Sequence, residues 1–400
     1  MARTRILTRT ILLVSFVSLF TDIASEMLYP VMPVYLRSIG FSVLLIGLLE
    51  GLAEATAGLS KGYFGHLSDV RRSRVPFIRG GYALSAFSKP MLAVTRFPPW
   101  IFLSRTLDRL GKGLRTSARD AILSDETTPE NKGKVFGFHR AMDTFGAAIG
   151  PTFALLFLSA HPGRYRWLFL IAFVPGLVAV GLTLLLRERR PEGPAEAASA
   201  GPRVGFLSYL RYWRAAPAGF RPLVTGLLLF TLFNSSDAFL LLAVKYRGFS
   251  DAEMIGFYIF YNLAFALLSF PAGAIADRVG LRTMVVFGLL TFSVVYFFFG
   301  FAVSALAFGA LFLLYGVYAS ATEGMAKALI SNLAARSDTA TALGFYNGLS
   351  SLAALVASSL AGLLWSAIGP KAMFMVSGSG VFLVAVYLGL VFRRGPAAVP

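Results

Sequence analysis

The sequence predicts an all-α polytopic membrane protein built from two pseudo-symmetric bundles of six transmembrane helices each. Of its 400 residues, 56% are hydrophobic and only 14% are charged, and the mean hydropathy is +0.69. A soluble core of ordinary size cannot hide so much apolar surface. One helical span needs about 20 apolar residues, so the chain has room for about a dozen spans. The long apolar runs do not alternate as the strands of a β-barrel do.

Two pairs of matching segments indicate that the second bundle is a copy of the first. The tripeptide Gly-Phe-Ser occurs at residues 40–42 and again at 248–250, and a Gly-to-Asp loop occurs at 65–69 and again at 273–277. Both pairs are separated by the same 208 residues. Duplicated helical bundles in one hydrophobic chain are typical of transporters whose pathway lies between the two halves.

The apolar runs between the loops define the predicted spans in order. The spans of the first half cover residues 10–36, 43–63, 75–95, 99–118, 135–158 and 166–187. The spans of the second half cover residues 222–245, 253–275, 282–302, 304–329, 341–366 and 371–392. We therefore expect an N-terminal six-helix bundle at 1–187, a cytoplasmic linker at 188–219 and a C-terminal six-helix bundle at 220–400.

The predicted linker has two parts of different composition. It opens on a run rich in Pro, Glu, Ala and Gly, which is typical of a flexible connection. Its last part, residues 206–214, mixes aromatic residues with arginine. This mixture is found in helices that lie at a membrane interface and equally in an ordinary solvated linker, so both interpretations stay open.

The formal charge of +17 is concentrated in alternate loops. The basic residues of these loops and of the two ends are Arg3, Arg5, Arg9, Arg71, Arg72, Arg74, Lys132, Lys134, Arg187, Arg189, Arg190, Arg393 and Arg394. This positive-inside pattern predicts a multi-pass protein of the cytoplasmic (inner) membrane with both termini in the cytoplasm. The expected partners are the lipid bilayer, a small-molecule substrate and protons, with no nucleic acid, and we expect a monomer.

The residue types argue against an enzyme and against a resident cofactor. The chain has no cysteine and only three histidines, His66, His139 and His161. No nucleophile motif, nucleotide-binding loop or metal-ligand spacing is present, so we expect neither catalytic residues nor a metal site. The lack of a phosphate-binding loop also argues against ATP-driven transport.

The Gly-to-Asp loops resemble the signature G-x-L-x-D-R-x-G-R-R of the major facilitator superfamily. The second copy follows that pattern closely, whereas the first carries Val70 at the first arginine position and Arg72 at the glycine position. The resemblance implies the superfamily's fold and a conformational latch at the cytoplasmic face, in which Asp69 meets the start of span eleven. The residues implied for this latch are Gly65, Asp69, Arg72, Gly273, Asp277 and Arg278.

Span five carries a pattern of small residues that is similar to a motif of the superfamily's antiporters, G-x8-G-x3-G-P-x2-G. The matching residues are Gly137, Gly146, Gly150 and Pro151, and Ala154 replaces the last glycine. Small residues let helices pack closely, and proline can kink or hinge a span. The resemblance implies antiport, while the structural alternative is close packing of spans five and eight.

Ionisable residues inside the spans are concentrated in the first half. Each costs about 2.5–3.5 kcal/mol on insertion scales, so each suggests a function or a partner. Asp22 and Glu26 lie four residues apart on one face of span one, and Glu54 lies in span two. Arg105 of span four matches the arginine of the superfamily's R-x-x-Q-G, which is linked there to proton transfer, whereas Asp108 stands in place of the glutamine and Arg109 in place of the glycine.

The structural alternative for these charges is a set of buried ion pairs. Asp143 of span five would pair with Arg105 or Arg109 and hold spans four and five together, while Arg119 would snorkel to the cytoplasmic end. In the second half, Asn234, Asp237 and Glu323 occupy helices that line the cavity in the superfamily. For Glu323, an intrahelical pair with Lys327 remains the alternative, and Tyr346 would suit an aromatic substrate.

These observations predict a secondary active transporter that works by alternating access and exports a small amphipathic or cationic molecule by proton antiport. The predicted proton-coupling residues are Asp22, Glu26, Glu54, Arg105, Asp108 and Asp143. The predicted substrate-binding residues are Asp22, Glu26, Arg105, Asn234, Asp237, Glu323 and Tyr346. Proton-coupled uptake of a metabolite by symport is the main alternative. A divalent-metal transporter, suggested by the carboxylates of spans one and two, and a membrane sensor are the others.

Overall fold

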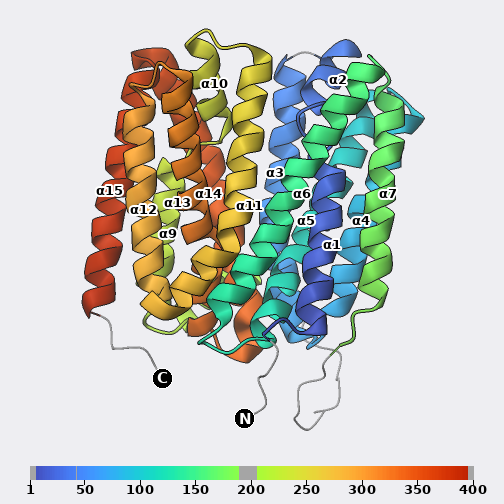
Figure 1. Cartoon of the computed structure of the whole chain (residues 1–400). Helices are drawn as coiled ribbons and strands as arrows, with labels where there is room; N and C mark the ends of the chain where they lie inside the picture. The colour runs from blue at the N-terminus through green and yellow to red at the C-terminus, as the bar shows by residue number, and fades with distance from the viewer. Residues whose placement is uncertain (1–5, 42, 189–204, 395–400) are drawn as a thin grey trace. The chain divides into compact units, whose positions relative to one another are not determined.

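The computed structural model describes residues 6–41, 43–188 and 205–394, and it contains no strand within them. In the first half the helices are α1 (Arg9–Glu26), α2 (Met32–Ser38), α3 (Val43–Val70), α4 (Val75–Val94), α5 (Pro98–Asp125), α6 (Lys132–Ala160) and α7 (Tyr165–Leu184). In the second half they are η1 (Ser208–Arg211), α8 (Tyr212–Ala215), α9 (Phe220–Phe233), α10 (Ala238–Tyr246), α11 (Asp251–Val279), α12 (Leu281–Phe299), α13 (Ala305–Leu333), η2 (Arg336–Asp338), α14 (Thr339–Ile368) and α15 (Pro370–Arg394). Figure 1 shows their course.

The all-helical fold class with two six-helix bundles is confirmed, but two of the twelve predicted spans are broken. The first is divided into α1 and α2, and the seventh into α9 and α10. Other helices continue beyond their predicted spans, as α3 does to Val70 and α5 to Asp125. A helix of 28 residues is about 42 Å long, whereas the apolar core of a bilayer is about 30 Å thick. Apolar runs therefore mark the membrane and not the helix ends.

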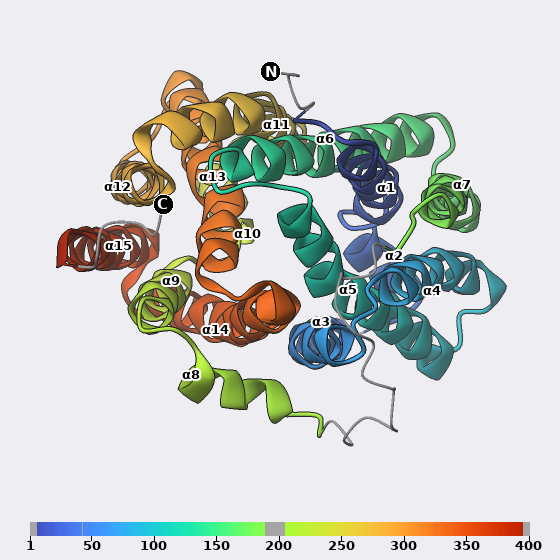
Figure 2. The ribbon, with the colours of Figure 1, turned by 90° about the horizontal axis from the view of Figure 1, so that it is seen from below.

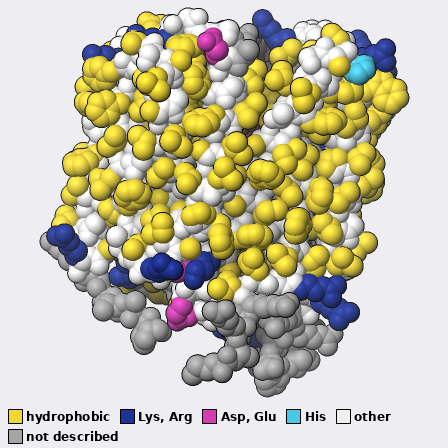
Figure 3. Space-filling view, in the orientation of Figure 1, with side chains coloured by type: hydrophobic (Ala, Val, Ile, Leu, Met, Phe, Trp, Pro, Cys, Tyr) yellow, Lys and Arg dark blue, Asp and Glu magenta, His cyan; other side chains and the backbone are white. Residues whose placement is uncertain are grey.

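Eight helical stretches in the described part of the chain are long and apolar enough to cross a membrane. They are α6, α7, α9 with α10, α11, α12, α13, α14 and α15. The remaining long helices, α1, α3, α4 and α5, all belong to the first half and carry charged side chains within their length. On the face seen in Figure 3, hydrophobic side chains predominate, and lysine and arginine gather toward the two ends.

The chain packs as two compact units that exchange the starts of two helices. The first unit contains Met1–Thr127, Met142–Ala215 and Ala334–Ser351. The second contains Thr128–Ala141, Ala216–Leu333 and Leu352–Pro400. The start of α6 thus packs within the second unit, and the start of α14 packs within the first. The domain boundaries at 187 and 220 describe the covalent repeat and stay a prediction.

Helices within each unit pack side by side. In the first unit, α5 packs against α3 and α4, and α7 packs against α4 and α1 (Figure 2). In the second unit, α13 packs against α11 and α12, and α15 packs against α12 and α9. The second unit has a core of stacked aromatic rings, of which Phe292 and Tyr296 have centroids 4.0 Å apart.

The repeated Gly-Phe-Ser tripeptide marks a turn that only glycine makes without strain. Gly40 has φ of +96° and Gly248 has φ of +89°, in the region that residues with a Cβ atom avoid. Ser250, the last residue of the second copy, caps α11, since its Oγ accepts from the backbone N–H of Glu253 at 3.2 Å. The Glu253 carboxylate accepts from the backbone N–H of Ser250 at 2.8 Å, which completes a capping box.

The end of the predicted linker is helical and packs on the first unit. Residues 189–204 of the linker lie outside the described part of the chain. In η1, Tyr209 is buried, and its ring fills the space beside Gly62, where an added Cβ would lie 2.5 Å from it. In α8, burial and then the carboxylates of Asp338 and Asp69 raise the pKa of Tyr212 to about 12. This segment is therefore a packed element and not a freely solvated linker.

Arg72 is strained at the position where the second copy of the loop has glycine. Its φ is +49°, whereas Gly280 at the equivalent position has φ of +93°. We expect Arg72→Gly to raise the free energy of unfolding by about 0.5–1 kcal/mol, because the relieved left-handed strain exceeds the extra chain entropy of glycine. Thermal unfolding in detergent measures the change. Gly280→Ala is the opposite control and should lower the midpoint; an Arg72→Gly protein that melts below the native chain would contradict the strain.

Candidate functional site

Two glycines bring α6 directly against the backbone of α1 in the first unit. A Cβ atom at Gly146 would lie 2.5 Å from the carbonyl oxygen of Leu19, and one at Gly150 would lie 2.7 Å from that of Ile23. Any larger residue would therefore push the two helices apart. The predicted alternative, packing of span five on span eight, holds for Gly137, where a Cβ would overlap the carbonyl oxygen of Ser269 in α11. Gly146 and Gly150 instead serve the contact with span one.

This close approach places the Asp143 carboxyl against α1. The hydroxyl of Ser18 donates to Oδ1 of Asp143 at 2.5 Å. The carboxyl of Asp22 lies beside that of Asp143, and Glu26 lies near enough to act on Asp22 electrostatically. Two neighbouring carboxyl groups can share a hydrogen bond only when one of them carries a proton, because a carboxylate can only accept. The pair is therefore a candidate proton site between two helices.

The cation beside this pair is Arg119, and the predicted partners of Asp143 were wrong. Nη1 of Arg119 lies 3.7 Å from Oδ1 of Asp143 and donates to Ser18 at 2.9 Å. Its Nε and Nη2 both donate to Oδ1 of Asp120, at 3.1 and 2.9 Å. Arg105 lies 14 residues earlier in α5, a rise of about 21 Å, and so at another depth. Arg119 is buried and therefore does not extend to the cytoplasmic end as predicted. Its position next to Asp120 within a long helix is the sequence feature that could have indicated a buried ion pair.

Glu54 lies among cations of α3 and α5. Its Oε2 is 3.8 Å from Nε of Arg109, and its side chain is 48% exposed. Lys112, Lys61 and Arg105 also act on it electrostatically. Arg105 and Arg109 also act on Asp108, so these four cations are shared by two carboxylates.

Asp108 is neutralised by Lys89, a residue that the sequence did not single out. Nζ of Lys89 lies 3.3 Å from Oδ1 of Asp108, and Nη1 of Arg105 lies 4.0 Å from Oδ2. Lys89 is buried in α4 and also donates to the carbonyl oxygen of Ser85. The sequence signal was a lysine in the middle of a mostly apolar span, with no indication of which helix it faces.

Asn234 and Asp237 border the break between α9 and α10 in the second unit. The hydroxyl of Tyr315 donates to Oδ1 of Asp237 at 2.7 Å, and Nδ2 of Asn234 donates to the hydroxyl of Tyr318 at 3.2 Å. Both tyrosines belong to α13. The break is therefore tied to one neighbouring helix by two polar contacts.

The other predicted substrate residues lie in different places. Glu323 of α13 forms an ion pair with Arg140, from the part of α6 that belongs to the second unit, so it has an interhelical partner. Tyr346 is half-buried in the part of α14 that belongs to the first unit. The predicted set thus divides between the units, with Asn234, Asp237 and Glu323 in the second.

Asp69 caps the start of α14 within the first unit. Its Oδ2 accepts from the backbone N–H of Thr341 at 2.7 Å and from the Thr341 hydroxyl at 2.8 Å. Its Oδ1 lies 3.3 Å from Nη2 of Arg74, which also pairs with Asp125. A Cβ at Gly65 would lie 2.5 Å from the carbonyl oxygen of Ala340. Arg74 occupies the last arginine position of the loop signature, which is the signal that could have identified it.

Asp277 makes the equivalent contact at the start of α6 within the second unit. Its carboxylate accepts from the backbone N–H of Gly133 at 2.7 Å and from that of Lys134 at 3.0 Å. A side chain at Gly273 would overlap the carbonyl oxygen of Gly133. A carboxylate at a helix N-terminus satisfies free N–H groups and complements the helix dipole. Arg72 and Arg278 are exposed and are not brought into either cluster.

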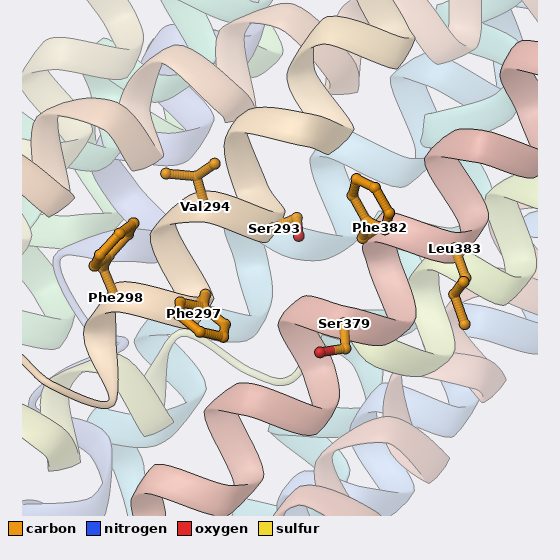
Figure 4. Close-up of a pocket in the computed structure, with 7 residues that line it drawn as sticks. All are labelled: Ser293, Val294, Phe297, Phe298, Ser379, Phe382 and Leu383. Carbon is orange, nitrogen blue, oxygen red and sulfur yellow. The ribbon is translucent and has the colours of Figure 1, made fainter.

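A groove on the second unit lies apart from all of these residues. It has a volume of about 430 Å³ and lies between α12 and α15, lined by Ser293, Val294, Phe297, Phe298, Ser379, Phe382 and Leu383 (Figure 4). Most of its lining is exposed apolar side chain, which suits contact with lipid chains. Separately, the described residues contain no group of three His, Asp or Glu side chains that could hold a metal ion.

Known proteins resemble this chain along most of its length. An uncharacterized MFS-type transporter of Methanocaldococcus jannaschii is 32% identical over 377 residues, which cover 93% of this chain and 92% of that protein. The human organic anion transporter MFSD10 superposes with a TM-score of 0.83 at 19% identity, covering 95% of this chain and 99% of that one. The fucose:proton symporter FucP of Escherichia coli superposes with a TM-score of 0.76 at 14% identity, covering 96% and 99%. The model of the Major Facilitator Superfamily matches residues 14–262 and 254–400, and the chain therefore belongs to this superfamily of transporters.

Proposed function

We propose that this secondary transporter exports a small cationic or amphipathic molecule in exchange for protons. The observation that carries the proposal is the Asp22–Asp143 pair, two neighbouring carboxyl groups of α1 and α6 that can share one proton. Ser18 and Arg119 complete the cluster, because Ser18 donates to Asp143 and Arg119 donates to Ser18. Glu26 lies one helical turn beyond Asp22 in α1 and adds a further carboxyl group to this face of the helix.

Exchange follows from simple electrostatics at such a cluster. A proton and a cationic substrate both reduce the negative charge of the same carboxyl groups, so the binding of one weakens the binding of the other. That mutual exclusion is what an antiporter requires. The close α1–α6 contact through Gly146 and Gly150 would transmit the protonation state to α6, because the two backbones cannot move independently.

The two aspartate caps fit the part of a latch in alternating access. Asp69 holds the start of α14 in the first unit, and Asp277 holds the start of α6 in the second. Each cap joins a segment of one sequence half to helices of the other half. We propose that both caps open during the transport cycle, and that the loops that carry them lie in the cytoplasm together with both termini, as the basic loops predict. The protein would work as a monomer in the cytoplasmic membrane.

Symport of an anionic metabolite is the second candidate, and the cations around Glu54 favour it. Four cations near one exposed carboxylate could bind an anionic group of the substrate. A proton on Glu54 would release those cations, so a proton and an anion would bind together. The similar structure of MFSD10 is that of an organic anion transporter, and FucP is a fucose:proton symporter; at 19% and 14% identity both likenesses support the fold alone.

Flux measurements on the purified protein in liposomes separate the two candidates. Compounds that raise the melting temperature in a screen of organic cations and anions would be loaded and followed under an imposed pH gradient. Antiport predicts that cations accumulate on the acidic side, against the inward flow of protons, whereas symport predicts that anions accumulate on the alkaline side. A flux that ignores the pH gradient in both series would exclude proton coupling altogether.

A further inference from the structure

Span seven is interrupted in the second unit by four residues that are not helical. α9 ends at Phe233 and α10 begins at Ala238 within one apolar stretch of 27 residues, and both helices can be followed in Figure 1. The intervening residues are Asn-Ser-Ser-Asp. In a membrane, non-helical backbone is tolerated where protein or a polar cavity satisfies it, and such breaks commonly adjoin binding sites. The two serines have protein partners: Ser235 with Tyr296 at 3.1 Å, and the N–H of Ser236 with Ser358 at 3.2 Å.

The amide of Asn234 retains an unsatisfied polar atom at this break. Its Oδ1 is buried and has no hydrogen-bond partner, while its Nδ2 donates to Tyr318. Turning the amide over would let Oδ1 accept from the Tyr318 hydroxyl but would leave Nδ2 unpaired. An orphaned buried polar group costs about 1–3 kcal/mol, so a bound donor would offset a real penalty.

Within the described part of the chain, no cation is paired with the Asp237 carboxyl. Glu323 and Arg140 are the charged groups there that act on Asp237, and these two are already paired with each other. The Asp237 carboxyl accepts a hydrogen bond from the neutral hydroxyl of Tyr315. A carboxylate in this setting is compensated fully only when a proton or another positive group joins it.

The tyrosine that contacts the Asp237 carboxylate belongs to a cluster of rings from α11, α12 and α13. The ring centroid of Tyr315 lies 4.9 Å from that of Tyr261, 5.1 Å from that of Tyr318 and 6.3 Å from that of Tyr296. Tyrosine faces attract organic cations, and the attraction is larger where water is excluded. Asp237 is hydrogen-bonded to one tyrosine of α13, and the amide of Asn234 is hydrogen-bonded to another. A carboxylate, an amide oxygen and tyrosine rings together are groups that recognise an ammonium ion.

We propose that the break in span seven binds the organic ammonium group of the transported molecule, between the Asp237 carboxylate and the Asn234 carbonyl and against the ring of Tyr315. This assignment rests on the proposed function for its transport role, since it names the substrate class of that exporter. Binding itself requires no pH gradient, so it can be measured separately from coupling.

Binding of defined probes to the purified protein at constant pH tests the assignment. The probes are benzyltrimethylammonium, choline and tetraphenylphosphonium; the comparisons are the neutral choline isostere 3,3-dimethyl-1-butanol, sodium chloride and citrate. At least one organic cation should raise the melting temperature, and isothermal titration should show its affinity reduced at least tenfold in Asp237→Asn. Asn234→Asp adds a second carboxylate to the break and should tighten binding. Glu130→Gln, an exposed carboxylate in the loop before α6, is the matched control and should bind as the native chain does.

Three results would contradict the binding of an ammonium group at Asp237. Equal affinity in Asp237→Asn and the native chain, stabilisation by sodium chloride or citrate alone, or no response to any organic cation would overturn the assignment. If Asp237→Asn does not fold, the gain in Asn234→Asp supplies the decision alone. Specific cation binding without pH-dependent flux would disprove antiport but support the binding site. Flux driven by the pH gradient, together with equal cation affinity in Asp237→Asn and the native chain, would support antiport but disprove the binding site.

Discussion

Asp22→Asn is expected to abolish the response of substrate flux to an imposed pH gradient, with a fall in the gradient-driven rate of at least about tenfold. Asparagine cannot take up or release a proton between α1 and α6. It can still donate a hydrogen bond to Asp143, so the close contact of the two helices should persist. The loss should therefore affect coupling and leave the thermal stability within about 1 kcal/mol of the native chain.

Two neighbouring variants serve as controls for this result. Glu26→Gln removes the next carboxylate on the same face of α1 and should retain most of the pH response. Ser18→Ala removes the hydroxyl that donates to Asp143 without removing a titratable group, and should alter the pH at which flux responds. A pH response that survives Asp22→Asn and disappears in Glu26→Gln would move the coupling group one turn along the helix.

Arg119→Met is expected to cause the largest loss of stability of any single substitution of a charged residue in the first unit, about 3–5 kcal/mol. Arg119 is the cation for two carboxylates: Asp120, whose side chain is fully buried, and Asp143. Removing one partner of a buried ion pair leaves an uncompensated charge, and this cost greatly exceeds the net contribution of the intact pair. Thermal and denaturant unfolding in detergent measure the change.

A double substitution distinguishes the buried charge from simple loss of packing. Arg119→Met with Asp120→Asn removes both charges of the buried Arg119–Asp120 pair and should recover the part of the lost stability that the unpaired Asp120 causes, while Asp143 still lacks its cation. Arg37→Met, an exposed arginine at the end of α2, is the matched control and should change stability by no more than about 0.5 kcal/mol. If the double variant is less stable than Arg119→Met, the ion pair is not the source of the effect.

Much of the fold could be predicted because a bilayer imposes a simple rule on the sequence. Apolar runs of sufficient length must be helices, and the 208-residue offset between the two Gly-to-Asp loops indicates that they occur twice. The breaks in spans one and seven could not be predicted in this way. Their residues remain apolar enough on average to continue the run, and the break depends on polar partners from other helices, such as Tyr315 and Tyr318 for span seven.

The candidate site shows the same division at the level of single residues. The sequence correctly indicated that charges gather in the first half, because an ionisable residue inside a span stands out wherever it occurs. It could not indicate that Asp143 faces Arg119 and that Asp108 faces Lys89. Partners across helices depend on the depth and rotation of each helix, and both are determined by side-chain packing that no local pattern encodes.

The paired loops make the distinction clear. By itself the sequence determined that this chain is a duplicated helical membrane protein with acidic groups in span one, because length, hydropathy and repetition are local properties. The resemblance to the superfamily also placed Asp69 at the start of span eleven, as the structure has it. Only the tertiary structure decided that Asp277 caps the start of α6, and that glycines bring α6 against α1 beside Asp22. Those arrangements arise from contacts between segments more than a hundred residues apart, whose geometry is determined by the packing of whole helices.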